Sequence, residues 1–337
     1  MAGDADVAPR RTTSTQRDTM KSFAFVFPGQ GSQAVGMLDG WSGHPAVAET
    51  LREASDALDE DIGTLIQGGP KEALALTTNT QPVMLVAGVA AWRAWLAEGG
   101  AQPTVLAGHS LGEYTALVAA GALTLAQAAP LVRFRAQAMQ QAVPVGVGAM
   151  AAVLGMEAAR VVAGCAEATA SFAADSGEVV EAVNFNDPMQ TVIAGSKAAV
   201  DKACEIVKAG GAKRALLLPV SAPFHSSLMR PAAEALRERL ESVSIQTPRI
   251  PVINNIDVAV ETDTTRIRDA LVRQAAGPVR WVETVQALQA RGVEAIVECG
   301  PGRVLAGMVK RIAPDVASGA LYDPASLDQT RQLLTTP

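Results

Sequence analysis

The sequence predicts an α/β fold built on a parallel sheet, with a small ferredoxin-like domain inserted into a larger one. Two short runs of wholly apolar residues, at 23–27 and 105–107, are typical of strands buried on both faces of a parallel sheet. Helical patterns follow both runs, and strands that alternate with helices indicate a layered α/β structure. Between residues 147 and 219 the order becomes strand, helix, strand, strand, helix, strand, which is that of a ferredoxin-like unit.

The elements of the larger part follow in order along the chain. The run at 23–27 ends at Pro28-Gly29, a pair that is typical of a turn. Apolar residues at helical spacing then predict helices at 47–58, 82–97 and 111–120. Gly121 follows the last of these in the position that helix C-termini favour. The same alternation resumes later, with a strand at 251–256, a helix near 266–275 and a strand at 295–298.

The inserted part has its own elements. Its strands are expected at 149–154, 179–184, 190–194 and 214–220, and its helices at 157–170 and 197–209. A turn at Asn186-Asp187-Pro188 joins the two middle strands. We therefore assign residues 21–146 and 220–325 to the large domain and residues 147–219 to the insert. The cleft between two such domains is where we expect the functional site.

The ends and the composition limit the class of protein. The polar residues 1–20 are expected to be a disordered extension, and 326–337 a C-terminal tail. With 49% apolar and 18% charged residues among 337, the chain has the composition of a globular protein. Its net charge of −6 argues against nucleic acid as the main partner. No run approaches the roughly 18 apolar residues that a membrane span requires, so we expect no membrane association.

The cysteines indicate the compartment. Cys165, Cys204 and Cys299 lie far apart and show no paired spacing, which indicates free thiols in a reducing environment. We therefore expect a cytoplasmic protein. A monomer is our expectation for the oligomeric state, on which the sequence carries no direct signal.

The most informative motif is GxSxG, at Gly108-His109-Ser110-Leu111-Gly112, with a strand pattern before it and a helix pattern after it. This is the context of a nucleophile elbow, whose tight turn lifts the serine hydroxyl above the strand ends. The helix N-terminus behind the serine favours developing negative charge. The alternative is a turn of small residues with an incidental serine, which leaves the flanking pattern unexplained. We therefore predict that Ser110 is a nucleophile.

A serine nucleophile needs a base, and the chain has three histidines. His109 adjoins the serine, so its side chain should point away, and His44 lies in a loop-like stretch without other chemistry. His225 follows the last strand of the insert, where the chain re-enters the large domain beside the cleft. A lone histidine is more often an ordinary polar residue than a catalyst, but we predict His225 as the base. No spacing selects an acidic third member such as Asp257 or Glu298, so a dyad oriented by a backbone carbonyl is as plausible as a triad.

Arg135 is the most informative charge. It shares a helical face with Leu131, Ala138 and Ala142, whereas Arg133 falls on the polar face of the same pattern. A guanidinium on an apolar face needs an anionic partner or several carbonyls. The pattern leaves two readings open, an internal ion pair and a clamp for a substrate carboxylate.

A second glycine-rich segment, at residues 29–34, matches GxGxxA after a strand and so raises a dinucleotide-binding alternative. We reject it, because glycines interrupt the following helix and no acidic residue ends a second strand at the right distance. A loop whose backbone N–H groups supply an oxyanion hole near the serine fits better.

Together these motifs resemble a known family, the malonyl-CoA:acyl carrier protein transacylases of bacterial fatty acid synthesis. The resemblance covers about residues 21–325. Its motifs are Phe27-Pro28-Gly29-Gln30-Gly31-Ser32-Gln33, Gly108-His109-Ser110-Leu111-Gly112-Glu113-Tyr114, Ser221 to His225, Val272-Arg273-Gln274 and Gly300-Pro301-Gly302. It implies an α/β-hydrolase-like core with a ferredoxin-like insert, consistent with the fold predicted above.

The resemblance also implies an activity. Ser110 would take the malonyl group from coenzyme A, with His225 as base, and pass it to the phosphopantetheine thiol of an acyl carrier protein. Coenzyme A is then a substrate, and no cofactor or metal is expected.

Further roles follow from the same resemblance. Backbone amides of Gln30 and Leu111 would hold the oxyanion, and Arg135 would pair with the malonyl carboxylate. The Gln274 main-chain carbonyl would orient the histidine. Asn184 matches a position that lines the cleft.

Two rival functions and two further expectations complete the sequence-based predictions. A serine hydrolase or thioesterase would have no use for a buried Arg135, and a docking module without turnover would not need the Ser110–His225 pair.

Phe224, beside the histidine, would crowd a methyl branch on the acyl group, or it is simply a wall of the core. A basic patch for an acidic carrier protein is expected from Lys197, Lys202, Lys208, Lys213, Lys310 and Arg311, unless these are ordinary solvated charges.

Overall fold

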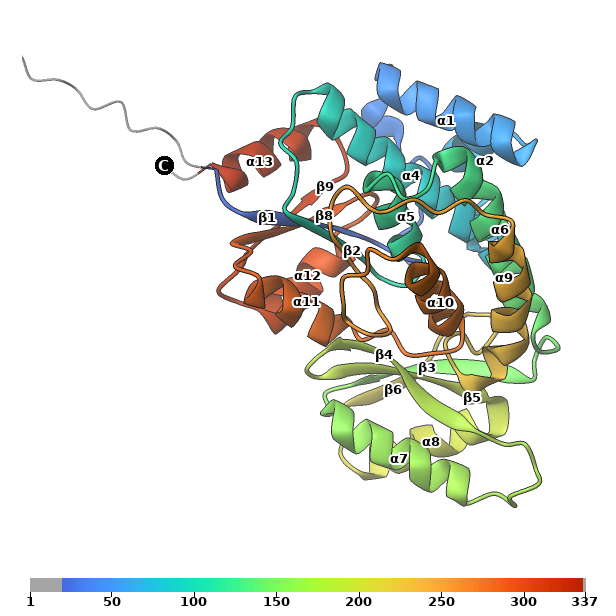
Figure 1. The fold of residues 1–337 in the computed structure, drawn as a ribbon. Helices are drawn as coiled ribbons and strands as arrows, with labels where there is room; N and C mark the ends of the chain where they lie inside the picture. The colour runs from blue at the N-terminus through green and yellow to red at the C-terminus, as the bar shows by residue number, and fades with distance from the viewer. Residues whose placement is uncertain (1–19, 336–337) are drawn as a thin grey trace, which may run out of the picture.

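The computed structural model describes residues 20–335 of the chain (Figure 1). The extension expected at 1–20 therefore lies, except for Met20, outside the described residues. Within these residues no helix is both long enough and apolar enough to cross a membrane.

The larger part is built on a five-stranded parallel sheet with the strand order β7-β2-β1-β8-β9. Its strands are β1 (Phe23–Phe27), β2 (Val105–Gly108), β7 (Val252–Ile253), β8 (Ala295–Cys299) and β9 (Ala317–Leu321). All five residues of β1 are buried, since Phe23, Phe25 and Phe27 pack on one face while Ala24 and Val26 pack on the other. The predicted parallel sheet with two covered faces is confirmed.

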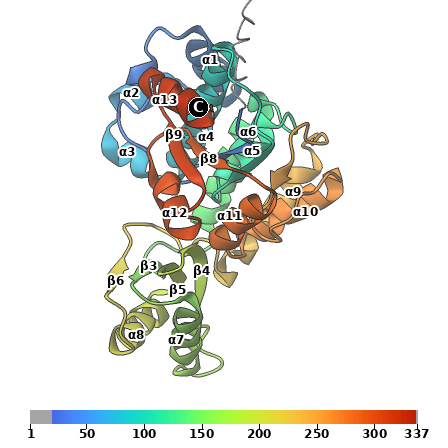
Figure 2. The same cartoon turned by 90° about the vertical axis from the view of Figure 1, so that its left-hand side faces the viewer.

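Helices cover both faces of this sheet (Figures 1 and 2). The face of Val26 is covered by α11 (Trp281–Ala290) and α12 (Val304–Ile312). The face of the three phenylalanines packs against the remaining helices. These are α1 (Pro45–Leu58), α2 (Ile62–Gly68), α3 (Lys71–Ala75), α4 (Thr77–Ala97), α5 (Gly112–Ala119), α6 (Leu125–Gln141), α9 (Arg230–Glu241), α10 (Thr264–Ala275) and α13 (Pro324–Leu334). Short 3-10 turns lie at Asp39–Trp41 and Ser227–Met229.

The smaller part is a four-stranded antiparallel sheet with the order β4-β5-β3-β6. Its elements are β3 (Gly148–Leu154), α7 (Ala158–Ala170), β4 (Val180–Asp187), β5 (Gln190–Ser196), α8 (Lys197–Ala209) and β6 (Arg214–Leu217). Both helices lie on the face of this sheet that points away from the parallel sheet (Figure 1). The topology is ferredoxin-like, as the sequence predicted, and all its elements fall within residues 147–219.

Three expectations about the larger part are corrected. The helix expected at 82–97 begins at Thr77 and contains Pro82 within it. The strand expected at 251–256 ends at Ile253, because the next two backbone N–H groups leave the sheet: that of Asn254 donates to the Ala259 carbonyl and that of Asn255 to the Glu113 carboxylate. The tail expected at 326–337 is wrong for residues 326–334, which belong to α13 and bury Leu327 and Leu334 in the core.

Candidate active site

The predicted elbow joins β2 to α5, and Ser110 occupies its left-handed corner with φ 52°. The glycines on either side are needed for close approach of the chain to itself. A Cβ on Gly108 would lie 1.9 Å from the carbonyl carbon of Gly112, and one on Gly112 would lie 2.0 Å from the carbonyl oxygen of Phe27. The strained serine is thus held on a turn that only glycine neighbours permit.

Ser110 and His225 lie together, as the sequence predicted. The Oγ of Ser110 is 2.7 Å from Nε2 of His225. The other ring nitrogen, Nδ1, is 2.9 Å from the main-chain carbonyl oxygen of Gln274 and 3.2 Å from that of Gly277. Because a carbonyl can only accept, Nδ1 carries the hydrogen and Nε2 presents its lone pair to the serine hydroxyl.

The electrostatic surroundings keep this imidazole neutral. His225 is buried, and burial lowers its pKa to about 3, with the nearby Arg135 charge acting in the same direction. Neither acidic residue considered from sequence contacts it. Asp257 pairs with Arg273 at 2.6 Å, and Glu298 accepts a hydrogen bond from the Ala306 backbone at 2.9 Å. The histidine is therefore oriented by carbonyl oxygens and not by a carboxylate.

Arg135 lies beside the same hydroxyl. Its side chain is 2% exposed, and one terminal nitrogen is 3.3 Å from Ser110 Oγ. The guanidinium also donates to Oε1 of Gln81 at 2.7 Å and to Oε1 of Gln274 at 2.9 Å. Arg133 lies on the opposite face of α6, as the helical pattern predicted, and pairs there with Glu60 at 2.6 Å. No ion pair to Arg135 occurs within residues 20–335, which argues against the internal ion pair.

The remaining predicted residues line one cavity of about 430 Å³ between the two parts of the fold. Gln30 and Leu111 border it next to Ser110, and Asn184 borders it from β4. In the described part of the chain, neither the Gln30 nor the Leu111 backbone N–H donates to a protein acceptor. Two backbone donors close to the serine are therefore available to a ligand.

His109 corrects one expectation. We expected its side chain to point away from the site, but it lines the same cavity. Its Nε2 is 2.8 Å from Oδ1 of Asn186, so it joins the elbow to β4 of the smaller sheet. Burial lowers its pKa, which keeps this imidazole neutral as well.

The expected basic patch has less free charge than the sequence suggested. Lys197 pairs with Asp201 at 2.6 Å and Lys202 with Glu205 at 3.2 Å, both along α8. Arg311 pairs with Asp187 at 2.7 Å.

Two side chains that hold the predicted site in place, those of Asn255 and Gln81, were not found from the sequence. Asn255 accepts a hydrogen bond from the Ser110 backbone N–H at 2.7 Å, and Gln81 holds Arg135. A signal for the first was the pair Asn254-Asn255 after a buried strand, where polar residues meet at the carboxyl edge of a parallel sheet. A single Gln inside an apolar helix, as at Gln81, was a weaker signal of the same kind.

The site contains a serine hydroxyl, a histidine imidazole and an arginine guanidinium. Within residues 20–335 no group of three or more His, Cys, Asp or Glu side chains is arranged to hold a metal ion. The hydroxyl can attack a carbonyl while the neutral imidazole takes its proton. The free backbone donors can hold the resulting oxyanion, and the buried guanidinium can bind a carboxylate.

Comparison with known proteins agrees with this chemistry. The family model described as acyl transferase domain matches residues 24–322. Malonyl CoA-acyl carrier protein transacylase of Escherichia coli strain K12 is 50% identical over 315 residues, which are 93% of this chain and 100% of that protein.

Solved structures give the same result. An acyl-carrier-protein S-malonyltransferase from Burkholderia pseudomallei superposes with a TM-score of 0.90 at 63% identity, covering 92% of this chain and 99% of that one. A malonyl-transacylase in complex with a type II polyketide synthase acyl-carrier protein gives a TM-score of 0.89 at 48% identity, with coverages of 92% and 99%. These matches extend over both sheets, and the chain belongs to the acyl transferase family, among the malonyl CoA-acyl carrier protein transacylases.

Proposed function

We propose that this protein moves a malonyl group from coenzyme A to the phosphopantetheine thiol of an acyl carrier protein in fatty acid synthesis. One observation carries the proposal. A serine hydroxyl lies 2.7 Å from a neutral imidazole and 3.3 Å from a buried guanidinium, in a cavity of about 430 Å³. The base and the carboxylate-binding group thus both contact the nucleophilic oxygen of Ser110. The names of the related proteins support the same donor and acceptor.

In the first half-reaction, Ser110 Oγ attacks the thioester carbonyl carbon of malonyl-CoA while His225 Nε2 takes the hydroxyl proton. The negative charge on the carbonyl oxygen is stabilised by the free backbone N–H groups of Gln30 and Leu111 and by the N-terminus of α5. The carbon–sulfur bond then breaks, and the imidazolium returns its proton to the departing coenzyme A thiolate. The product is a malonyl ester on Ser110.

In the second half-reaction the carrier protein's thiol replaces the coenzyme A thiol. His225 takes the thiol proton as the sulfur attacks the ester carbonyl, and the same backbone donors hold the oxyanion. Collapse of this intermediate breaks the carbon–oxygen bond, and Ser110 recovers its proton from the imidazolium. Free enzyme and malonyl carrier protein result.

Arg135 selects the acyl group in this proposal. A malonyl group carries a free carboxylate, and a guanidinium binds a carboxylate through two parallel hydrogen bonds. Among residues 20–335 the buried cation has no carboxylate partner, so an anionic substrate would supply the countercharge. A hydrolase that acts on uncharged esters has no use for such a group, and a docking module has no use for the aligned serine and histidine.

Other parts of the site have supporting roles. Asn184 lines the cavity from β4 and would contact the acyl or pantetheine chain. The three cysteines are free and buried, which supports the expectation of a reducing cytoplasmic environment.

The decisive experiment is the intact mass of the protein after brief mixing with malonyl-CoA or acetyl-CoA. We expect one malonyl adduct that is lost when carrier protein is added, and no adduct on Ser110→Ala. Arg135→Ala should lose most malonyl labelling, whereas Arg133→Ala, on the solvent side of the same helix, should keep it. Equal labelling by acetyl-CoA with release to water would instead identify a hydrolase.

A further inference from the structure

Arg135 is held by neutral groups. Its two terminal nitrogens donate to side-chain amide oxygens, at 2.7 Å to Gln81 on α4 and at 2.9 Å to Gln274 on α10. Gln81 and Gln274 are both buried, with exposures of 3% and 0%. A buried guanidinium is usually paired with a carboxylate, so this choice of partners needs a reason.

A carboxylate, that of Glu113, is close by, but the side-chain amide of Gln274 lies between it and Arg135. Glu113, in the first turn of α5, is 2% exposed, and its Oε2 accepts hydrogen bonds from Nε2 of Gln274 and from the Asn255 backbone, both at 2.9 Å. The same Nε2 also donates to the Ser110 carbonyl at 3.0 Å. Both hydrogens of the Gln274 amide therefore have acceptors, and its oxygen faces Arg135.

This arrangement allows one orientation of the Gln274 amide. Turning it over would place its NH₂ against the guanidinium, donor against donor. Its oxygen would then face the Glu113 carboxylate and the Ser110 carbonyl, acceptor against acceptors. Glu113 and Ser110 thus orient the amide so that it offers Arg135 an acceptor without a charge.

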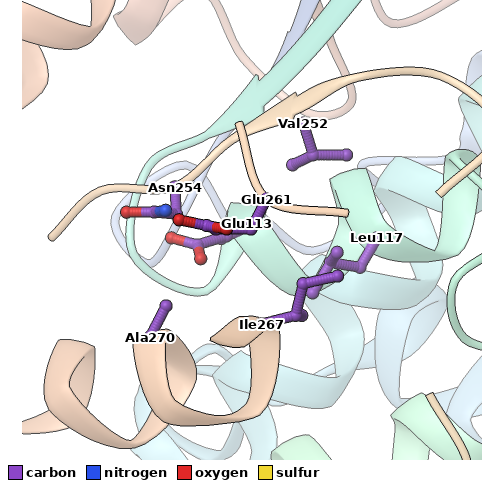
Figure 3. A pocket seen from close by; sticks show the side chains of 7 residues that line it. All are labelled: Glu113, Leu117, Val252, Asn254, Glu261, Ile267 and Ala270. Carbon is purple, nitrogen blue, oxygen red and sulfur yellow. The ribbon is translucent and has the colours of Figure 1, made fainter. Parts of the chain in front are cut away.

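Glu113 also borders a second, smaller cavity, which neither of Arg135's amide partners lines. This cavity, of about 10 Å³, is large enough for about one water molecule, and a second carboxylate, that of Glu261, borders it as well (Figure 3). Burial raises the pKa of Glu113 to about 7, and the hydrogen bonds from Gln274 and Asn255 oppose this shift more strongly than the charge of Arg135 does. Among the groups that favour the carboxylate form of Glu113, the amide donors of Gln274 and Asn255 therefore contribute more than the guanidinium does, although burial outweighs them all.

We infer that Gln81 and Gln274 are specificity-determining residues, because they hold Arg135 in place with uncharged acceptors and so leave its positive charge to the carboxylate of the acyl group. A carboxylate at either position would form an internal ion pair and neutralise the site before substrate arrives. The inference rests on the proposed function. It predicts that a change from amide to carboxylate lowers the preference for malonyl over acetyl groups.

The test uses binding, so that it does not depend on catalysis. In a Ser110→Ala background, the affinities for malonyl-CoA and acetyl-CoA are measured by calorimetry. We expect Gln81→Glu to lower the malonyl-to-acetyl affinity ratio by at least about tenfold, the effect of a close charge pair. Gln274→Glu keeps the main-chain carbonyl that binds His225. It should act in the same direction, with Glu113, whose pKa burial already raises to about 7, taking the proton that two facing carboxyl groups must share. Gln137→Glu, an exposed site on the helix of Arg135, adds the same charge elsewhere and should leave the ratio unchanged.

Each outcome is decisive. If the Ser110→Ala protein has no malonyl preference, the proposed function fails before the variants are compared. If it has the preference and both Glu variants keep it, only the inference is wrong. A failure of both variants to fold, judged by thermal unfolding, also overturns it, because the amides would then serve folding and not selectivity.

Discussion

Asn255 holds the Ser110 turn from two sides. Its Oδ1 accepts a hydrogen bond from the Ser110 backbone N–H at 2.7 Å, and its Nδ2 donates to the Gly108 carbonyl at 2.7 Å. The side chain is fully buried. The sharp turn takes the Ser110 N–H and the Gly108 carbonyl out of regular structure, and the Asn255 amide gives both a hydrogen-bond partner. Asn255 lies 145 residues from Ser110 along the chain.

We therefore predict that Asn255→Ala lowers the free energy of unfolding by about 2 kcal/mol, because it leaves buried backbone groups without partners. The malonyl loading rate should fall as well, since the turn that carries Ser110 loses its support. Urea denaturation and loading kinetics measure the two effects. Asn254→Ala is the matched control, because that side chain bonds its own loop and not the elbow. Loading by Asn255→Ala at the wild-type rate would contradict this role.

The glycines of the elbow give a second prediction. A methyl group at Gly112 would meet the Phe27 carbonyl oxygen at 2.0 Å, so backbone must move. Gly112→Ala should lower the free energy of unfolding by about 3 kcal/mol or more. Gly68→Ala places its methyl group in open space at the end of α2 and should be neutral or slightly stabilising. Thermal melts of the two variants decide this, and similar melting temperatures would refute the steric argument.

The protonation of His225 gives a third prediction. Burial and the charge of Arg135 lower its pKa to about 3, so the imidazole should stay neutral and able to accept a proton as the pH falls from 8 to 5. The chain has three histidines, so their ¹⁵N resonances can be followed in a labelled sample. We expect the His225 ring nitrogens to keep the shifts of a neutral ring at pH 5. A titration midpoint near the ordinary value of about 6.5 would show that the site is more open to water than the structure indicates.

Local patterns account for the parts of the site that sequence could predict. Ser110 lies between glycines that join a buried strand to a helix, and Arg135 lies on the apolar face of its own helix. The two covered faces of the parallel sheet follow from the wholly apolar run of β1, and the ferredoxin-like unit follows from the order of its elements. Each of these features depends on residues that are close in sequence.

The parts that could not be predicted depend on distant contacts. The group that orients His225 is a main-chain carbonyl, which every residue has, so no residue type marks it; only the resemblance pointed to Gln274. The hydrogen-bond acceptors of Arg135 belong to Gln81 and Gln274, which lie 54 and 139 residues from it along the chain. The short helix α13 (Pro324–Leu334) was missed because its buried Leu327 and Leu334 lie only two turns apart, too few repeats to reveal a pattern.

Phe224 gives the last prediction. Its ring is 8% exposed, borders the cavity next to His225 and packs with Met150 and Val192 of the smaller sheet. A methyl branch on the acyl group would need space that this ring occupies, so Phe224→Ala should increase loading from methylmalonyl-CoA relative to malonyl-CoA. The variant should also lose about 3 kcal/mol of stability, as truncations of buried aromatic rings do.

Phe172→Ala separates the two effects. Phe172 is half-buried against the core of the smaller sheet and does not border the cavity, so its truncation should destabilise the protein and leave the acyl preference unchanged. Competition between the two acyl-CoA substrates, read as the mass of the acyl-serine, measures the preference directly. An unchanged ratio in Phe224→Ala would mean that the ring is a wall of the core and that backbone or Arg135 geometry excludes the branch. A shift in both variants would instead trace the preference to general loosening of the fold.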